Sequence, residues 1–311
     1  MHGAVGQRPR LGPHRLRGLL IRWFAARAPT GPLADALTER GWPRGTDAAH
    51  DLWLPTPRVD RHLDRRLAEL TPPPGAVLAA IPGLASITRK RRLHATLQPH
   101  HPGLMPPGWL PDQAPPPPGP LVAKDDRRQR RQGISFDTPP TAPPQHLLLQ
   151  RRIESTRVHG RAVSLRAWLL LVRDDALTAW LFDDAALLYA PAGDWITRSR
   201  KPPRGAPSTL SAWRPELLPS LQRALAAVAA LASPAATRPA HRCIEWLGAD
   251  FVVDPVGRPW LLEINRKPLM RPRFKAELPL RIAVLRGALD AAKAHPPRRY
   301  VALGSWPLAH A

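Results

Sequence analysis

Two carboxylates and an amide near the end of the chain have the types and spacing of a cation site: Asp250, Glu263 and Asn265. They lie in two apolar runs that flank a turn containing proline and glycine, a pattern that predicts a β-hairpin over residues 250–265. With the turn centred between Val256 and Gly257, Asp250 lies directly opposite Glu263. Opposed side chains on neighbouring strands lie roughly 5 Å apart, so the hairpin brings the two carboxylates together.

Side chains alternate along each strand, which assigns every hairpin residue to one of two faces. Asp250, Glu263 and Asn265 share one face, and the same register places Asp254 opposite Pro259. The apolar residues of the other face form the expected core side: Phe251, Val253, Trp260, Leu262 and Ile264.

Two carboxylates placed opposite each other repel, and a cation between them relieves the repulsion. Carboxylate and amide oxygens, with positions left for water and phosphate, suit magnesium. Asn265 is also the only asparagine of the chain, which indicates that its chemistry is needed at this point. The alternative is that the carboxylates only form ion pairs with nearby bases, namely Arg242, Arg266 or Lys267.

The segment from Cys243 to Phe251, followed by residues 260–265 and Pro268, resembles the closing ATP-grasp strands of the tubulin-tyrosine ligase-like family. The resemblance implies an α+β ATP-grasp fold, in which two α+β lobes hold the nucleotide, together with an amino-terminal α/β lobe. It implies that magnesium-ATP is bound by the matching residues, Asp250, Glu263 and Asn265, with Glu263 also catalytic.

A lysine at the end of an expected strand, Lys124, precedes a basic loop that reaches Gly133. Such a lysine can contact phosphate oxygens as a point charge while the backbone amides of the loop close over them. The segment resembles the phosphate loop of the family, which assigns Lys124, Arg130 and Gly133 to ATP binding. Arg131 stands where the family has a second glycine.

The run from Gln150 to Ile153 resembles the hinge that follows the adenine edge in the family, which assigns Gln150, Arg151 and Ile153 to the nucleotide. Arg166, in the next strand, matches a catalytic arginine that serves a phosphate or a substrate carboxylate. A salt-bridged structural arginine is the alternative for this position. Three nearby positions lack the lysine, aspartate and asparagine of the family: Ala162, Ser164 and Arg198.

These residues need a scaffold, and the apolar periodicity predicts one of mixed type. Strands are expected over residues 19–24, 51–53, 121–124, 133–136, 146–150, 167–172 and 178–188, and helices over 33–39, 85–97, 210–231 and 281–294. The proline-rich segment 106–118 can continue neither a helix nor a central strand. The expected division is a basic tail (1–18), an amino-terminal lobe with a proline-rich linker (19–118), an ATP-grasp core (119–300) and a tail (301–311).

The composition limits the remaining functional classes. One cysteine among 311 residues excludes an internal disulfide framework and a cysteine-built zinc site, and it fits a reducing, cytoplasmic location. No apolar run approaches the roughly 20 residues of a membrane span. The net charge of +22 favours an anionic partner, but only six of the 46 basic residues are lysine, so biased composition explains much of this charge.

The resemblance implies an ATP-dependent carboxylate-amine ligase that adds an amino acid, such as glutamate or glycine, to a protein or peptide through an acyl phosphate. The expected acceptor is an acidic segment, such as a tubulin-like tail, attracted by arginines around the site: Arg151, Arg152, Arg161, Arg198, Arg200 and Arg266. The alternatives are a pseudoenzyme that binds ATP and a basic nucleic-acid-binding protein. Charge alone supports the latter, so neither nucleic acid nor a membrane is the expected partner.

Overall fold

The computed structural model describes residues 21–25, 28–46, 48–54, 72–110, 116–126, 134–136, 144–191, 201–232, 241–266 and 268–308. The expected basic tail, residues 1–18, lies outside the described residues.

Among the described residues, a ten-stranded sheet has the order β1-β2-β3-β12-β9-β10-β14, and three further strands pair off this path. Its path consists of β1 (Trp23–Phe24), β2 (Leu52–Trp53), β3 (Val77–Leu78), β12 (Cys243–Val253), β9 (Arg161–Arg173), β10 (Ala176–Phe182) and β14 (Tyr300–Pro307). The strands off the path are β8 (Arg157–Val158) and β11 (Ala186–Tyr189), which pair with β9, and β13 (Pro259–Arg266), which pairs with β12. The first three strands pair in parallel, and β3 is also parallel to β12, whereas the other pairs are antiparallel.

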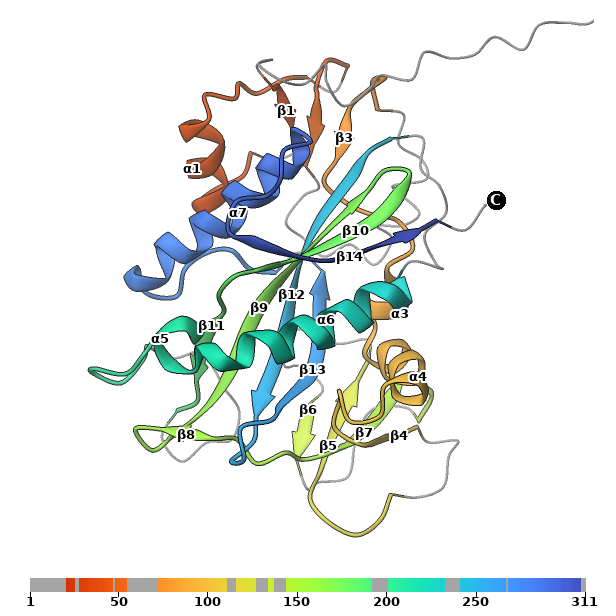
Figure 1. Ribbon diagram of the computed structural model, residues 1–311, viewed down its shortest axis with the longest axis vertical. Coiled ribbons are helices and arrows are strands. Elements are labelled where there is room, and N and C mark those ends of the chain that lie inside the picture. The colour runs from red at the N-terminus through yellow and green to blue at the C-terminus, as the bar shows by residue number, and fades with distance from the viewer. Residues whose placement is uncertain are drawn as a thin grey trace, which may run out of the picture.

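Helices cover both faces of this sheet (Figure 1). The helices α1 (Pro32–Glu39) and α7 (Leu278–Ala292) lie side by side, and α6 (Leu218–Ala232) crosses in front of β9, β12 and β13. The other helices are α3 (Ala85–Thr88), α4 (Lys90–His100) and α5 (Leu210–Trp213), with single 3-10 turns at Pro144–His146, Pro215–Leu217 and Lys275–Glu277.

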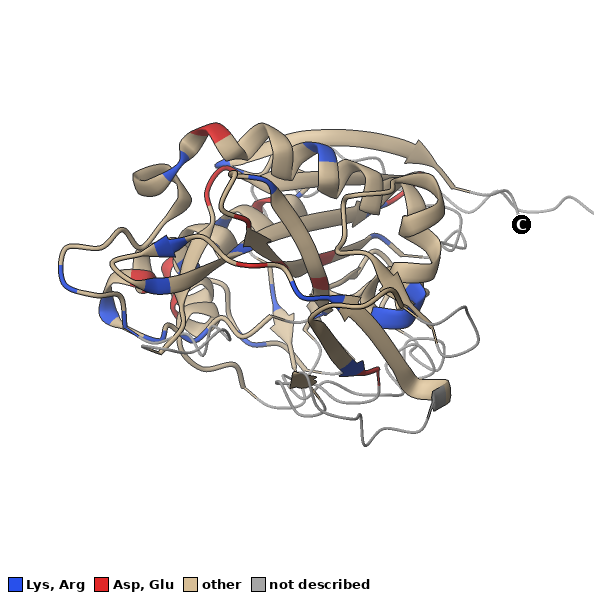
Figure 2. Ribbon diagram, turned by 90° about the horizontal axis from the view of Figure 1, so that it is seen from below, with Lys and Arg blue, Asp and Glu red and all other residues tan. Residues whose placement is uncertain are grey.

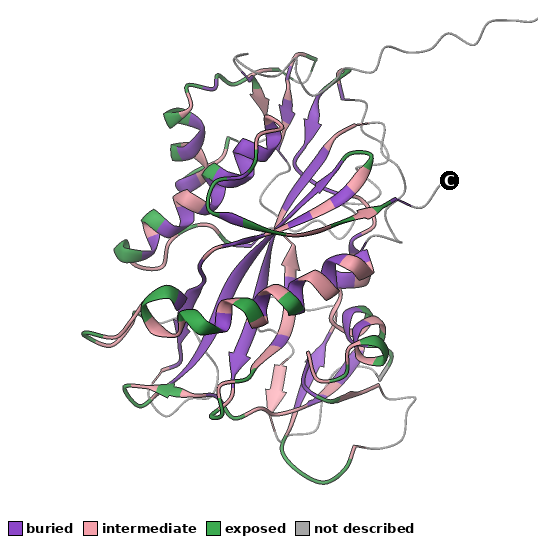
Figure 3. Cartoon of the chain, in the orientation of Figure 1, coloured by how far each residue is buried: buried purple, intermediate pink, exposed green. Residues whose placement is uncertain are grey.

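The central strand β9 is apolar on both faces and therefore contributes to two cores. Leu165 and Leu169 pack in the core that includes α6, whereas Trp168 and Leu170 pack in the core that includes α1 and α7. The long strands are accordingly buried along most of their length (Figure 3). Each such side chain contributes roughly 1.5–3 kcal/mol of hydrophobic stabilisation, so β9 is a rigid support for the residues it carries.

A second, four-stranded antiparallel sheet has the order β4-β7-β5-β6. Its strands are β4 (Gly108–Trp109), β7 (Leu147–Arg151), β5 (Leu121–Asp125) and β6 (Ile134–Phe136). Both sheets include strands from either side of residue 118, because β3 pairs with β12 and β4 pairs with β7. The expected domain boundary at residue 118 therefore does not coincide with a boundary between the two sheets.

Three expected elements are interrupted. The strand expected over 178–188 is two strands, β10 and β11, because the Asp184 carboxylate accepts hydrogen bonds from the backbone of Ala185 and Ser211 and turns the chain. The helix expected over 85–97 breaks at Arg89, which is extended, and the helix expected over 210–231 breaks where Pro215 follows α5.

The end of the chain also differs from the expectation of a tail over residues 301–311. Residues 300–307 form β14, which pairs along the edge of β10, and the Tyr300 hydroxyl donates a 3.0 Å hydrogen bond to the Val284 carbonyl of α7. Within the part of the chain that the structure describes, no helix has the length and apolar character needed to cross a membrane.

Candidate functional site

The hairpin of β12 and β13 has the predicted register at the end that carries Asp250 and Glu263. Asp250 is the partner of Glu263, and Gly248 is the partner of Asn265. Beyond Asp250 the register shifts by one residue, so that Phe251 pairs with Leu261. Such a bulge places two residues of one strand against one residue of the other and reorients the side chains that follow.

The bulge corrects two details of the predicted hairpin. Pro259 lies opposite Val253 rather than Asp254. The core face of β13 is formed by Leu261 and Ile264, which are buried, whereas Trp260 and Leu262 are only half-buried. The register prediction failed here because alternation was carried through the bulge without interruption.

Asp254 instead fixes the turn of the hairpin. Its carboxylate accepts a 2.7 Å hydrogen bond from the backbone N–H of Arg258 and a 2.9 Å bond from the indole N–H of Trp260. The Arg258 guanidinium lies 4.0 Å from the centroid of the same indole ring. These contacts hold the loop so that the strands, and with them the carboxylates at their far end, keep a fixed register.

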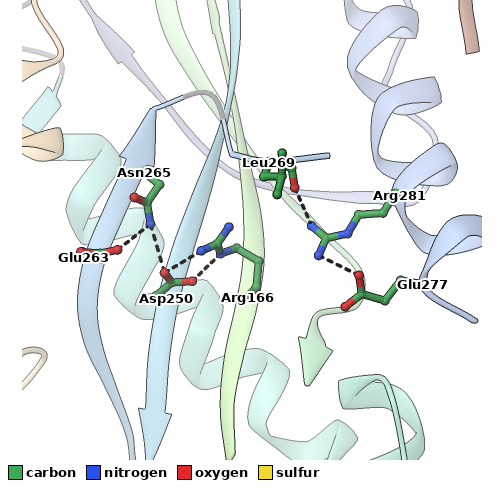
Figure 4. Close-up of polar contacts among 7 residues, drawn as sticks. All are labelled: Arg166, Asp250, Glu263, Asn265, Leu269, Glu277 and Arg281. Carbon is green, nitrogen blue, oxygen red and sulfur yellow. Dashed lines mark hydrogen bonds and ion pairs between the residues drawn. The ribbon is translucent and has the colours of Figure 1, made fainter. Parts of the chain in front are cut away.

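Asp250, Glu263 and Asn265 form one hydrogen-bonded group (Figure 4). The Asn265 amide nitrogen donates to Asp250 Oδ2 at 3.0 Å and to Glu263 Oε1 at 2.9 Å. Arg166, which projects from the adjacent strand β9, donates to both oxygens of Asp250, with Nη2 at 2.7 Å from Oδ2. The sequence-predicted residues are thus brought together by two strand pairings, β12 with β13 and β12 with β9.

The bases proposed as alternative ion-pair partners are engaged elsewhere. Arg242 pairs with Asp174, and Arg266 pairs with the buried Glu245, whereas Lys267 lies outside the described residues. The cations that do face the two carboxylates come from distant segments of the chain. Arg166 pairs with Asp250, and Lys90 Nζ lies 3.7 Å from Glu263 Oε2.

Two further groups complete the charged cluster. Lys124 is buried in β5, between β6 and β7, and interacts electrostatically with Glu263, Lys90 and Asp250. His94 lies one helical turn after Lys90 on α4, is buried, and interacts electrostatically with Lys124. The small sheet and α4 therefore meet the hairpin at this point.

Burial governs the ionisation of these groups. Burial lowers the pKa of Lys124 to about 8, although Glu263 and Asp250 oppose the shift. Burial raises the pKa of Asp250 against the effect of Arg166. Burial also opposes ionisation of Glu263, but Lys90, the Asn265 amide and Lys124 outweigh it and lower the pKa of this carboxyl.

The donor set fits a small hard cation such as Mg²⁺. Oxygens of Asp250 and Glu263 both lie within 3.0 Å of a single atom, the Asn265 amide nitrogen, so one centre can reach both carboxylates. Rotation of that amide would present its oxygen as the third ligand. Among the described residues, no group of three His, Cys, Asp or Glu side chains could hold a metal ion.

Comparison with known proteins relates part of the chain to a family of known sequence. The model of the tubulin-tyrosine ligase family matches residues 211–300, the segment that contains Asp250, Glu263, Asn265 and most of α7. This segment is similar in sequence to the tubulin-tyrosine ligase family. The predicted resemblance is thereby confirmed. A search among curated proteins finds no sequence match.

The fold of the whole chain is also matched. The crystal structure of the C-terminal domain of K. lactis Pby1, an ATP-grasp enzyme that interacts with the mRNA decapping enzyme Dcp2, superposes with a TM-score of 0.60. The match covers 91% of this chain and 98% of that chain at 13% sequence identity. The predicted α+β class and ATP-grasp fold are confirmed.

Residues outside the hairpin also match motifs of the family, and only some of them are brought to the site. Gln150 is buried, and its Oε1 has no hydrogen-bond partner among the described residues, whereas Ile153 is half-buried. The Arg151 guanidinium donates to the carbonyls of Pro118 and Pro117 at 3.1 and 3.3 Å, so its side chain serves the proline-rich segment. Arg130, Arg131, Gly133 and Arg198 lie outside the described residues.

Lys90, His94 and Arg273 were missed by the sequence analysis, although one signal was present. Lys90 begins α4, and a cation in the first turn of a helix is unfavourable for the helix dipole. Such a residue indicates a nearby anion, which here is Glu263. Arg273, in the loop between β13 and α7, interacts electrostatically with Arg166 and Asp250 of the site but carries no such signal in the sequence.

Proposed function

We propose that this protein is an ATP-dependent carboxylate-amine ligase of the tubulin-tyrosine ligase type. The observation that carries the proposal is the group of Asp250, Glu263 and Asn265 in an ATP-grasp fold, faced by cations from three other elements. Phosphoryl transfer depends on positioning and charge neutralisation more than on covalent participation of the protein, and this group offers both.

In this proposal, magnesium is held by Asp250, Glu263 and Asn265, and magnesium-ATP supplies an electrophilic γ-phosphate. Lys124, fixed between two strands, neutralises phosphate oxygens, and Gln150 and the hinge to Ile153 receive the adenine edge. Arg166 and Lys90 lie next to the carboxylates of Asp250 and Glu263. Both can then turn to phosphate, because a guanidinium and an ammonium bind phosphate as readily as carboxylate.

The chemistry has two steps. A carboxylate oxygen of the acceptor attacks the γ-phosphorus of ATP, and the bond from this phosphorus to the β-phosphate oxygen breaks. ADP is released, and the acceptor carries an acyl phosphate. The amine of an amino acid then attacks the acyl carbon, loses a proton and expels inorganic phosphate, which leaves an amide bond. Arg166 is the residue best placed to neutralise the charge that develops in both steps.

The identities of the acceptor and of the amino acid are part of the same proposal. Glutamate and glycine are the amino acids considered, and the acceptor is a protein or peptide rich in carboxylates. Of the arginines first assigned to its attraction, Arg151 and Arg161 donate to backbone carbonyls, and Arg266 pairs with Glu245. Arg198 and Arg200 lie outside the described residues, and Arg161, whose hydrogen bond to the Lys201 carbonyl is long at 3.5 Å, is the residue we retain for this role.

One observation favours a second function, that of an ATP-grasp pseudoenzyme which binds nucleotide or a partner without ligation. Ala162 and Ser164 stand where the family has a lysine and an aspartate, and both are buried in β9. The site thus lacks two charges that family members carry close to nucleotide and substrates.

The deciding experiment is calorimetry of magnesium-dependent ATP binding to wild type and Glu263→Gln, with Glu154→Gln as the control at an exposed carboxylate. Loss of the Glu263 charge should weaken binding at least tenfold, about 1.4 kcal/mol, while the fold is retained. Equal affinity of all three proteins would refute the site. An assay of ADP release with candidate amino acids and acceptor peptides then separates a ligase, which turns over, from a pseudoenzyme, which only binds.

A further inference from the structure

A second buried ion pair lies beside the metal-ligand group, on the side of α7 (Figure 4). Arg281 and Glu277 are both almost wholly buried, with Nη2 at 3.3 Å from Oε2, and Arg281 also donates to the Leu269 carbonyl at 3.4 Å. The Arg281 guanidinium lies 4.8 Å from the ring centroid of Trp168 in β9. These contacts fix the loop that connects β13 to α7, so the residues of that loop have defined positions.

Arg273 belongs to this loop and has a different environment. Its backbone N–H donates a 2.9 Å hydrogen bond to Glu277 Oε2, which anchors the residue at the cluster. Its Nη1 atom is buried and has no hydrogen-bond partner within the described part of the chain. Burial, together with the neighbouring charges of Arg166 and Arg281, lowers the pKa of Arg273 to about 10 against the opposing effects of Glu277 and Asp250.

The charges in this region do not balance. Around Arg273, three guanidinium groups, those of Arg166, Arg273 and Arg281, interact with two carboxylates, those of Asp250 and Glu277. Glu263, which also interacts with Arg166, is already faced by Lys90 and Lys124. Each carboxylate already pairs with an arginine, Asp250 with Arg166 and Glu277 with Arg281. Arg273 is therefore the guanidinium without a carboxylate partner, and its half-buried charge with a buried Nη1 atom is unfavourable unless a ligand supplies an anion.

We propose that Arg273 binds the α-carboxylate of the amino acid whose amine is ligated. The assignment to an amino acid rests on the proposed ligase function, whereas the anion site itself rests on the unpaired guanidinium. An α-carboxylate takes no part in amide formation, so it needs a passive partner, and the planar fork of arginine matches its two oxygens. Proximity to Arg166 and Asp250 places that partner next to the groups proposed to handle the phosphate.

A water molecule shared between Arg273 Nη1 and Glu277 Oε1, which also has no partner among the described atoms, would satisfy the cluster without any ligand. This reading predicts a structural role only. The experiment must therefore measure carboxylate binding directly rather than activity.

The test is saturation-transfer NMR with glycine, L-glutamate and L-tyrosine and with the amide of each, in the presence of magnesium and a non-hydrolysable ATP analogue. Wild type should bind one of the amino acids and should bind its amide at least tenfold more weakly. Arg273→Ala should abolish that difference, and Arg273→Lys should keep an intermediate affinity because it retains charge without the fork. Arg271→Ala, at an exposed arginine two residues away, is the matched control and should behave as wild type.

Nucleotide affinity, measured on the same proteins, keeps this proposal separate from the proposed function. Arg273→Ala should change the affinity for magnesium-ATP less than twofold. If wild type binds nucleotide but does not distinguish any amino acid from its amide, or if Arg273→Ala retains the distinction, the carboxylate site is wrong and the ATP site stands. If nucleotide does not bind but carboxylates bind through Arg273, the anion site stands and the ligase assignment fails.

Discussion

Asp250 accepts hydrogen bonds from Arg166 and Asn265, and Glu263 accepts one from Asn265 and faces Lys90. Cationic and amide groups of the chain thus compensate the charges of the two metal-ligand candidates. Binding of a cation between them must displace or reorient these partners, so the affinity of the site depends on how easily Arg166 and Lys90 exchange carboxylate for phosphate.

At Lys124, the contribution of one buried charge to ATP binding can be compared with its effect on the stability of the fold. Because burial lowers its pKa to about 8, the fold disfavours the charged form, and removal of the charge should relieve that penalty. We expect Lys124→Met to weaken ATP binding at least tenfold in calorimetry and to raise the melting temperature of the free protein. Lys275→Met, at an exposed position, should change neither quantity. Unaltered ATP affinity in Lys124→Met would remove this residue from the site.

The single cysteine permits a test of pH dependence. Burial raises the pKa of Cys243 to about 11, with Glu245 adding to the shift against Arg173. At pH 8 about one thiol in a thousand is then ionised, so a disulfide reagent should label the native protein far more slowly than the urea-unfolded chain. Since the unfolded thiol loses its proton near pH 8.5, this group makes folding stability fall as pH rises from there towards 11. Rapid native labelling at pH 8 would show that Cys243 is accessible.

At the scale of elements, a buried network joins the hairpin to the segment that leads into α3 and α4. The Glu245 carboxylate of β12 accepts a 2.7 Å hydrogen bond from the backbone N–H of Ile81 and a 2.7 Å bond from Arg266 Nε of β13. Arg266 also donates to the carbonyl of Ile81. The network fixes the start of the segment whose helix α4 presents Lys90 to Glu263.

Glu245→Gln should therefore affect both stability and the site. Loss of one partner of a buried ion pair costs about 3 kcal/mol, which chemical denaturation measures. The same variant should weaken magnesium-ATP binding, because α4 and its lysine lose their anchor. Glu39→Gln removes one partner of the exposed pair with Arg286 and should cost less than about 1 kcal/mol. Similar effects of the two substitutions would contradict the anchoring role.

At the scale of the whole molecule, the basic charge is spread over many elements of the described chain (Figure 2). A spread of this kind favours general attraction of anions over a shaped recognition surface. The net charge of +22 thus supports an acidic acceptor only in combination with particular arginines, the role that we propose for Arg161.

Binding of an acidic peptide and of a neutral peptide of equal length tests whether the acceptor is acidic. We expect the acidic peptide to bind more tightly at low salt and to lose this advantage as the screening length falls below roughly 8 Å. Arg161→Ala should reduce the advantage, whereas Arg298→Ala, at a distant and exposed position, should not. Peptide binding that ignores charge and salt would exclude an acidic acceptor.

The sequence by itself determined which polar residues of the hairpin share one face. Alternation along two short apolar runs sufficed to place Asp250, Glu263 and Asn265 on one face, because strand geometry repeats every two residues and the turn sets the register. The same reasoning failed at Leu262, where a bulge shifts the register, and at residues 301–311, where β14 completes the sheet.

Only the tertiary structure decided which cations meet these carboxylates. Arg166 reaches Asp250 because β9 pairs with β12, and Lys90 reaches Glu263 because α4 lies against the hairpin. The unpaired guanidinium of Arg273 likewise emerges only when α7 brings Glu277 and Arg281 to its loop. Contacts between segments far apart in the chain depend on how whole elements pack, and side-chain periodicity within one segment carries no information about them.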